Sequence, residues 1–206
     1  MRELSEQEHF WSGDFGDQYV VRNQSDTHIA SNLVLFAKAL ANTSPISSLL
    51  ELGSGSGNAL KALRQLLPGC DLYGAEINAK ACHHAQAANV AHVWQGSLFD
   101  YPRERTFELT LSKGVLIHLA PQMLPAAYGQ LYELSQRYIL ICEYYNPTPV
   151  EVSYRGHGGK LFKRDFAGEM LDRYSDLTLL DYGFFYRRDC NFPMDDTHWF
   201  LLEKRS

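Results

Sequence analysis

The sequence contains few cysteines, and their arrangement predicts neither a disulfide framework nor a zinc site. The four of them are widely spaced: Cys70, Cys82, Cys142 and Cys190. Zinc sites and small disulfide-stapled domains usually show closely spaced cysteine pairs, and this chain has no Cys-x-x-Cys. His83 and His84 lie on an expected helix, where neighbours diverge by about 100°. We therefore expect free, mostly buried thiols and no bound metal.

Long apolar runs and an excess of positive charge are also missing. No stretch approaches the roughly 18 apolar residues that would span a membrane, and residues 1–6 lack the apolar core of a signal peptide. The 206 residues carry a formal charge of −5, which argues against a broad nucleic-acid footprint. We expect a cytoplasmic protein with a small-molecule partner, no nucleic acid and no membrane, and leave the oligomeric state open.

A glycine-rich turn is the most informative feature that is present. An apolar strand at 48–52 contains Glu51 and leads into Gly53, Gly55 and Gly57, and a second strand ends at Glu76. Glycines let a backbone approach a ligand closely at a strand-to-helix turn. The second carboxylate stands where it can accept hydrogen bonds from ribose hydroxyls. The pattern predicts a site for a nucleoside-containing cofactor.

Details of the turn select the cofactor. A strict dinucleotide fingerprint requires glycine where Asn58 stands, and no Gly-Lys-Ser/Thr follows Gly53 to form a phosphate-binding loop. Glu51 would repel a pyrophosphate but attract a cationic ligand. S-adenosylmethionine carries a sulfonium and an ammonium group, so we predict this cofactor, with S-adenosylhomocysteine as product.

The arrangement Glu-x-Gly-x-Gly-x-Gly resembles that of the class I S-adenosylmethionine-dependent methyltransferases. The resemblance implies that the methionine end is held by Glu51, Gly53, Ser54, Gly55 and Gly57. It places Glu76 and Ile77 at the ribose, and Ser97 and Leu98 beside the adenine, where the family often has Asp at position 97. It also places Lys113 in the loop beneath the methyl group.

Alternating strands and helices predict a doubly wound α/β fold. Strands are expected at 48–52, 71–76, 90–95, 109–112, 138–143, 177–182 and 197–203, and helices at 31–41, 58–67, 79–89 and 122–135. The family resemblance implies a Rossmann-like class I methyltransferase fold with a seven-stranded, mostly parallel sheet and an antiparallel last strand. Residues 187–196 are expected to form a solvated edge loop. We divide the chain into an N-terminal aromatic lid, residues 1–30, and a single cofactor-binding domain, residues 31–206.

The N-terminal segment 10–23 is unusually aromatic and leaves two interpretations open. It could fold over the cofactor cleft, with Trp11 and Tyr19 near the sulfonium, where a cation–π contact contributes about 1 kcal/mol. Arg22 and Asn23 would then engage the acceptor. Alternatively, the segment is an ordinary helix that packs its aromatic side chains on the sheet edge.

The segment after the fifth expected strand is basic, whereas the chain as a whole is acidic. Its glycine-rich part, 154–166, could clamp an anionic small molecule through bidentate arginine contacts. Candidate acceptor-binding residues here are Tyr145, Asn146, Arg155, Lys160 and Arg164. The alternative is a solvated loop followed by a helix whose basic side chains face water.

A narrower resemblance follows from three segments. Residues 10–23, residues 112–119, and the stretch from 143–147 through 164–166 are similar to the methyltransferases associated with pseudaminic-acid biosynthesis. This resemblance implies that the acceptor is a nonulosonic acid, its nucleotide-activated form or another small polar metabolite. Two alternatives stay open: methylation of tRNA or protein, and an inactive cofactor-binding partner protein.

Methyl transfer is an in-line displacement, so the acceptor atom must be held roughly 3 Å from the methyl group. A hydroxyl acceptor also requires removal of its proton. His118 is the first candidate base, because its ordinary pKa leaves it neutral near pH 7, although a buried packing role would suit its apolar neighbours equally. The other candidates are His157, Tyr144 and Glu143.

Overall fold

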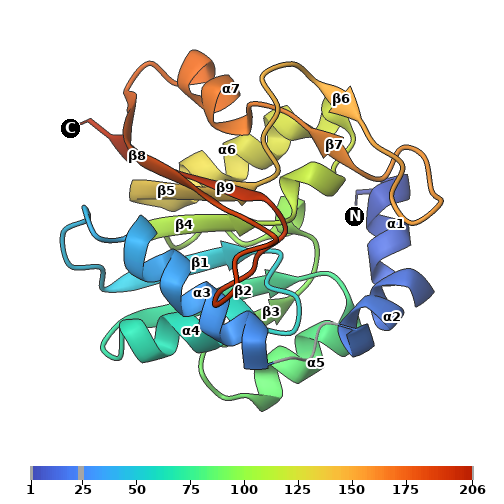
Figure 1. Ribbon diagram of the computed structural model, residues 1–206, viewed down its shortest axis with the longest axis horizontal. Helices are drawn as coiled ribbons and strands as arrows, with labels where there is room; N and C mark the ends of the chain where they lie inside the picture. The colour runs from blue at the N-terminus through green and yellow to red at the C-terminus, as the bar shows by residue number, and fades with distance from the viewer. Residues whose placement is uncertain (1, 23–25, 206) are drawn as a thin grey trace.

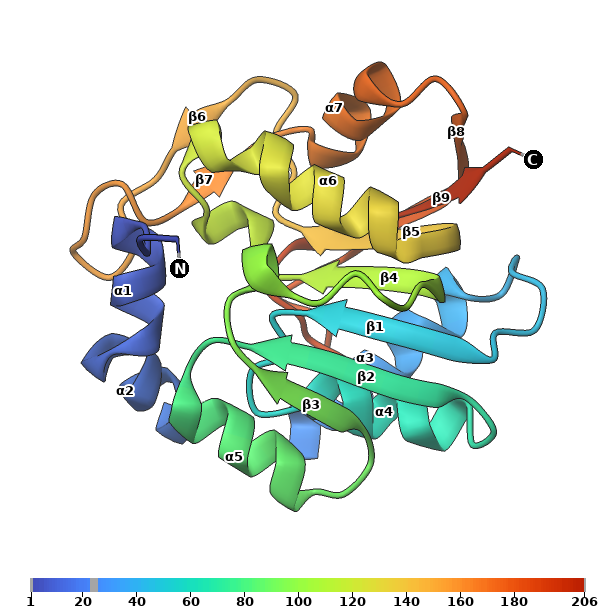
Figure 2. The same ribbon diagram turned by 180° about the vertical axis from the view of Figure 1, so that it is seen from behind.

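The computed structural model describes residues 2–22 and 26–205 as three layers, with a sheet between helices (Figures 1 and 2). The spatial order of the strands is β3 (His92–Gln95), β2 (Asp71–Glu76), β1 (Ser48–Leu52), β4 (Phe107–Lys113), β5 (Ser135–Glu143), β9 (Thr197–Lys204) and β8 (Leu177–Phe185). In this described sheet, β9 runs in the direction opposite to all the other strands. The predicted fold class is confirmed.

Helices bury the apolar faces of the central strands. All five residues of β1 are buried, as expected for a parallel strand covered on both sides. On one face, α3 (Asp26–Ala39) and α4 (Asn58–Leu66) contribute Phe36 and Leu63 to one core cluster. On the other face, α6 (Leu124–Leu134) and α7 (Phe166–Arg173) contribute Leu131 and Met170 to a second cluster. Helix α5 (Ala79–Ala87) packs against β2 and β3.

Two helices lie outside the carboxyl ends of the parallel strands (Figures 1 and 2). They are α1 (Glu6–Ser12) and α2 (Asp14–Arg22). Gly16 makes their close packing feasible, because a Cβ atom there would lie 1.9 Å from the carbonyl oxygen of Trp11. The helices therefore stand at the edge of the sheet where a doubly wound fold binds its ligand.

Three local features differ from the predicted pattern. Helix α3 begins at Asp26 rather than at residue 31, because its first turns also pack on the core through Ile29. The division at residues 30 and 31 thus falls inside a helix. Residues 150–163 include a small hairpin, β6 (Val150–Glu151) with β7 (Phe162–Lys163), and short 3-10 turns lie at Leu98–Asp100, Leu116–His118 and Pro121–Met123.

The cysteines are free thiols, as expected, with Cys190 exposed and the other three buried. No helix within residues 2–22 and 26–205 is long and apolar enough to cross a membrane.

Candidate active site

A cavity of about 450 Å³ lies between the carboxyl ends of the strands and the two N-terminal helices. Many residues predicted to bind the cofactor line it: Glu51, Gly53, Ser54, Gly55, Glu76, Ile77, Ser97, Leu98, Lys113, Trp11 and Tyr19. Two of the predicted catalytic residues, His118 and Tyr144, line it as well. Its volume is within the range of small-molecule and cofactor sites.

The glycine-rich turn requires glycine for two different reasons. At Gly53, where φ is +83°, a Cβ atom would lie 2.4 Å from a methyl carbon of Val115. At Gly55, where φ is +52°, a Cβ atom would meet nothing within 4 Å, so the backbone here borders open space. Gly57 is the N-cap of α4 and approaches Ala85 instead, outside the described cavity lining. Its contact with the methionine end stays a prediction.

The carboxylate of Glu76 fastens the end of β2 to the glycine-rich turn. Its Oε2 accepts a hydrogen bond from the backbone N–H of Gly55 at 2.7 Å, and its Oε1 accepts one from Asn78 at 2.7 Å. Burial raises the pKa of Glu76, and these backbone hydrogen bonds oppose the rise. Each carboxylate oxygen has two acceptor sites, so capacity remains for a vicinal diol.

Glu51 is a buried carboxyl group in need of a cationic partner. It is 2% exposed, and its Oε2 has no hydrogen-bond partner among the described residues. Burial raises its pKa to about 8, and the nearby Lys113 opposes this shift. An unpaired buried carboxylate is costly, so a bound ammonium group would satisfy it. The donor set at this end therefore fits the methionine part of the cofactor.

The Ser97 side chain is hydrogen-bonded to helix α1, so its hydroxyl already has a protein partner. Its hydroxyl donates a hydrogen bond to the Glu8 carboxylate, which also binds the Arg2 guanidinium. Burial opposes ionisation of Glu8, but hydrogen bonds from Arg2, Ser97 and Ser5 lower its pKa to about 2. The sequence analysis missed Glu8, although Ser5-x-x-Glu8 has the spacing of a helix capping box, which α1 forms.

His118 is a neutral side chain in the cavity wall. Its Nδ1 lies 2.7 Å from the carbonyl oxygen of Lys160, so Nδ1–H donates this bond and the lone pair is on Nε2. Burial lowers its pKa to about 4. The ring packs against those of Trp11 and Tyr154, at centroid distances of 4.6 and 4.9 Å. A catalytic role for His118 stays a prediction.

Glu143 and His157 are absent from the described cavity lining, and their role as candidate bases stays a prediction. The Glu143 carboxylate accepts hydrogen bonds from the Ser112 hydroxyl at 2.9 Å and from the backbone N–H groups of Val115 and Leu116 at 3.0 Å. It therefore shapes the loop after β4. His157 is exposed and packs against the ring of Phe10 with a centroid distance of 5.2 Å.

The basic segment lies beside α1 and α7 (Figure 1). It is absent from the described cavity lining, so the clamp stays a prediction that this geometry does not favour. Lys160 forms an ion pair with Glu6 of α1. Arg164 donates a hydrogen bond to Glu169 at 2.7 Å. Arg155 is exposed. Lys160 and Arg164 are thus paired with carboxylates, and Arg155 is directed to solvent.

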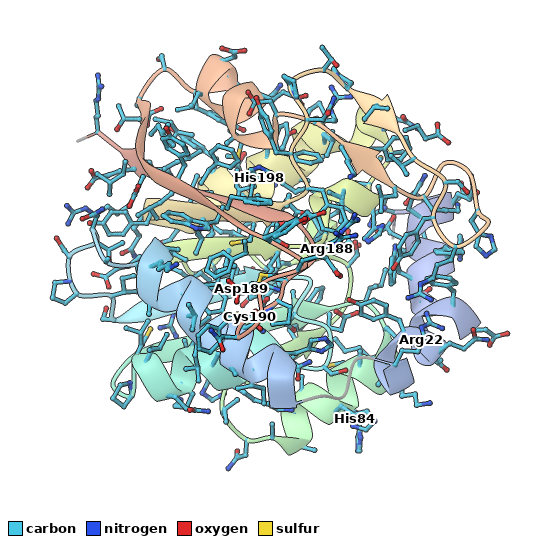
Figure 3. All side chains as sticks on the ribbon, in the orientation of Figure 1. Arg22, His84, Arg188, Asp189, Cys190 and His198 are labelled. Carbon is cyan, nitrogen blue, oxygen red and sulfur yellow. The ribbon has the colours of Figure 1, made fainter. Side chains whose placement is uncertain are left out.

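Three further predicted acceptor contacts also lie elsewhere. Tyr145 packs against the rings of His198 and Phe200, and Asn146 closes a local turn by donating to the Thr148 carbonyl at 2.5 Å. Arg22, on α2 in Figure 3, is exposed, with its guanidinium 5.4 Å from the centre of the Phe15 ring. Asn23 lies outside the described residues.

The sequence analysis missed the cavity wall opposite Ser97. This wall is formed by α3 and by the loop between β8 and β9, the loop that carries Arg188, Asp189 and Cys190 in Figure 3. Its lining residues include His28, Ser31, Asn32, Arg187, Met194, Asp195 and Thr197. The hydroxyl of Ser31 donates to the Pro193 carbonyl at 3.0 Å and joins the two segments. Residues 187–196 are largely solvent-exposed, as expected, but four of them also line the cavity.

The fold and the donor set define a class of protein: a Rossmann-like enzyme that binds a nucleoside cofactor with a cationic tail. Residues 49–137 match the family model described as a methyltransferase domain. This matched segment contains the glycine-rich turn, Glu76, Ser97 and Lys113, and its methyltransferase description agrees with the predicted S-adenosylmethionine-dependent activity. No curated protein sequence matches the chain significantly.

Solved methyltransferase structures share this fold. Magnesium protoporphyrin IX methyltransferase from Synechocystis PCC 6803, with bound S-adenosylmethionine, has a TM-score of 0.70 at 15% identity, with 100% of both chains covered. The 1,6-didemethyltoxoflavin-N1-methyltransferase from Burkholderia thailandensis, with bound S-adenosylhomocysteine, has a TM-score of 0.69 at 14% identity, over 100% of this chain and 93% of that one. DesVI from Streptomyces venezuelae has a TM-score of 0.65 at 15% identity, over 94% and 99%.

Proposed function

We propose that the enzyme methylates a small, polar, anionic metabolite, with a nonulosonic acid or its nucleotide-activated form as the favoured class. The observation that carries this proposal is Arg187, a cavity-lining cation on the loop between β8 and β9. Among the described residues its guanidinium forms an ion pair through Nε, 3.6 Å from Asp196, and the terminal nitrogens can meet a carboxylate or phosphate. Arg187 thus takes the role that the sequence assigned to Arg155 and Arg164.

Helices α1 and α2 cover the cavity, and this cover favours a small acceptor over a macromolecule. Helices α1 and α2 contribute Trp11 and Tyr19 to the lining, and the Asn78 side chain donates to the Trp11 carbonyl at 3.2 Å and to Asp17 at 2.8 Å. We include in the proposal that residues 1–30 act as a lid. The buried Nε1 of Trp11 has no partner among the described residues, as expected for a group that meets a ligand when the lid is closed.

The cofactor supplies an electrophilic methyl group when it is bound. Glu76 would hold the ribose hydroxyls, while Glu51 would bind the ammonium group in the buried part of the site. Trp11, with its ring in the wall, would exclude water and offer a π face to positive charge. The protein's main task is to hold the acceptor atom in line, because displacement at a sulfonium methyl depends on alignment.

The acceptor class is tested by label transfer. The full-length protein is incubated with methyl-tritiated S-adenosylmethionine and one of four acceptor groups: nonulosonic acids, their nucleotide forms, amino acids, or bulk tRNA. The proposal expects label in the first two groups, and an increase in KM when Arg187 is replaced by Ala. Label found only in RNA would overturn it. Binding of S-adenosylhomocysteine without transfer to any acceptor would favour the inactive partner protein.

A further inference from the structure

The cavity extends across the sheet and has two chemically different ends. Glu76 ends β2 and Ser97 follows β3 at one end, while Tyr144 follows β5 and Thr197 begins β9 at the other. The strands between them, β1 and β4, carry the glycine-rich turn and Lys113. With the ribose held by Glu76, as proposed above, the acceptor enters the second end.

The second end of the cavity contains a buried polar side chain and is not simply open surface. Asn32 is 3% exposed there, and its Oδ1 has no hydrogen-bond partner among the described residues. The neighbouring Ser31 holds the loop between β8 and β9 against α3 through the Pro193 carbonyl. A buried acceptor atom without a partner is costly, so Asn32 marks a place where a ligand donates a hydrogen bond.

A carboxylate and a phenol meet at the same end. Tyr144 follows β5, Asp195 lies on the loop between β8 and β9, and both side chains line the cavity. Burial raises the pKa of the Tyr144 phenol, and the nearby Asp195 carboxylate adds to this rise. A phenol at this place can donate a hydrogen bond to one carboxylate oxygen and leave the remaining acceptor sites of the carboxylate for a ligand.

We propose that Asp195 accepts the proton of the acceptor hydroxyl, that Tyr144 positions its carboxylate, and that Asn32 binds a second donor of the same molecule. The step is balanced. A lone pair of the hydroxyl oxygen forms the bond to the methyl carbon, the carbon–sulfur bonding pair stays on sulfur, and the hydroxyl proton moves to Asp195. The assignment rests on the proposed small hydroxylated acceptor, and it goes beyond it by naming the base.

Other titratable or charged groups face Asp195 and bear on its pH dependence. Tyr144 and Tyr19 interact with it electrostatically from β5 and α2, and Arg187 and Asp196 lie on its own loop. His28 of α3 lines the same cavity. His118 is the competing base, in the wall after β4. The test must therefore separate Asp195 from His118.

The decisive variants are Asp195→Asn, Tyr144→Phe and His118→Asn, with Asp172→Asn on the exposed side of α7 as a matched control. Acceptor is supplied as N-acetylneuraminic acid, as its nucleotide form and as a deproteinised extract of cells expressing the protein. We expect Asp195→Asn to lower kcat at least 100-fold, within the usual range for general base catalysis. Its affinity for S-adenosylhomocysteine should stay within twofold, and the control should keep wild-type activity.

Two readouts distinguish positioning from structural damage. Tyr144→Phe should lower kcat about 5- to 20-fold and move the acidic limb of the kcat pH profile. In the S-adenosylhomocysteine complex, the ¹³C carboxyl signal of Asp195, assigned by its absence in Asp195→Asn, should shift when acceptor is added. Retention of more than a third of kcat in Asp195→Asn, or loss only in His118→Asn, would overturn the inference. A labelled product that is not anionic would instead overturn the proposed acceptor class and leave the variants to decide the base.

Discussion

The carboxylate of Glu76 accepts a hydrogen bond from the backbone N–H of Gly55 at 2.7 Å. This contact joins the two motifs, 21 residues apart, from which the cofactor was predicted. It means that one side chain both shapes the glycine-rich turn and lines the end of the cavity proposed to hold the ribose.

Replacing Glu76 with Ala should therefore abolish cofactor binding and also lower stability. The Gly55 and Asn78 N–H groups would each lose a charged acceptor, at a cost of about 1.5–3 kcal/mol per bond. Calorimetric titration with S-adenosylhomocysteine and urea unfolding measure the two effects. Glu104→Ala, at an exposed position, serves as control. Wild-type affinity in Glu76→Ala would contradict the assigned role.

Cofactor affinity should depend on pH through Glu51. Its pKa of about 8 in the folded protein lies above that of the unfolded chain, so Glu51 is protonated near neutral pH before a cation binds. Binding of an ammonium group then releases this proton, and affinity should rise by roughly one to two orders of magnitude from pH 6 to pH 8. Titrations in buffers of different ionisation enthalpy count the released protons.

Glu51→Gln is the matched variant, because it keeps the shape and removes the ionisable group. It should weaken binding of S-adenosylhomocysteine and remove the proton release. The same linkage predicts that the unliganded wild-type protein loses stability as pH rises from about 4.5 to about 8, since the folded state holds the extra proton there. An unchanged proton count in Glu51→Gln would exclude Glu51 as the ammonium partner.

Ser97 should be unable to accept the aspartate that the family often has at this position. Ser97→Asp would place a second carboxylate against Glu8, which Ser97 now contacts through its hydroxyl. Repulsion between these buried acids should destabilise the attachment of α1 by about 2 kcal/mol. The double variant Glu8→Ser with Ser97→Asp exchanges the two groups and should recover part of the loss in thermal unfolding. Additive losses in the double variant would show that the two side chains are not coupled.

Glu143→Gln separates a structural role from a catalytic one. An amide offers one acceptor oxygen to the Ser112 hydroxyl and the N–H groups of Val115 and Leu116, and turns an N–H₂ group toward the rest of the loop. We expect a loss of about 2–3 kcal/mol in the free energy of unfolding. The pH profile of the remaining activity should keep its wild-type shape. Disappearance of one limb of that profile, with stability unchanged, would instead support Glu143 as the catalytic base.

The fold and the cofactor end of the cavity were predictable because their signals are local. β5 is a nearly continuous apolar run, and Glu51 stands two residues before Gly53, so adjacent positions carry the information. The short-range geometry of a strand-to-helix turn then fixes where the side chains point.

The acceptor end was not predictable, because its contacts join distant segments. Lys160 pairs with Glu6, 154 residues away in the sequence, and this pairing joins the basic loop to α1. Ser31 meets Pro193 across 162 residues, and that contact brings Arg187 and Asp195 into the wall. Composition shows that these loops are polar, but only the packing of α1 and α3 decides which loop faces the ligand.

The most direct test of the account is the thermal unfolding of the purified protein with S-adenosylhomocysteine, and separately with a nicotinamide dinucleotide. S-adenosylhomocysteine at about 100 times its Kd should stabilise the folded state by about 2.7 kcal/mol and raise the Tm by several degrees. The dinucleotide should leave the Tm unchanged. A clear rise with the dinucleotide and none with S-adenosylhomocysteine would contradict the assignment of the site.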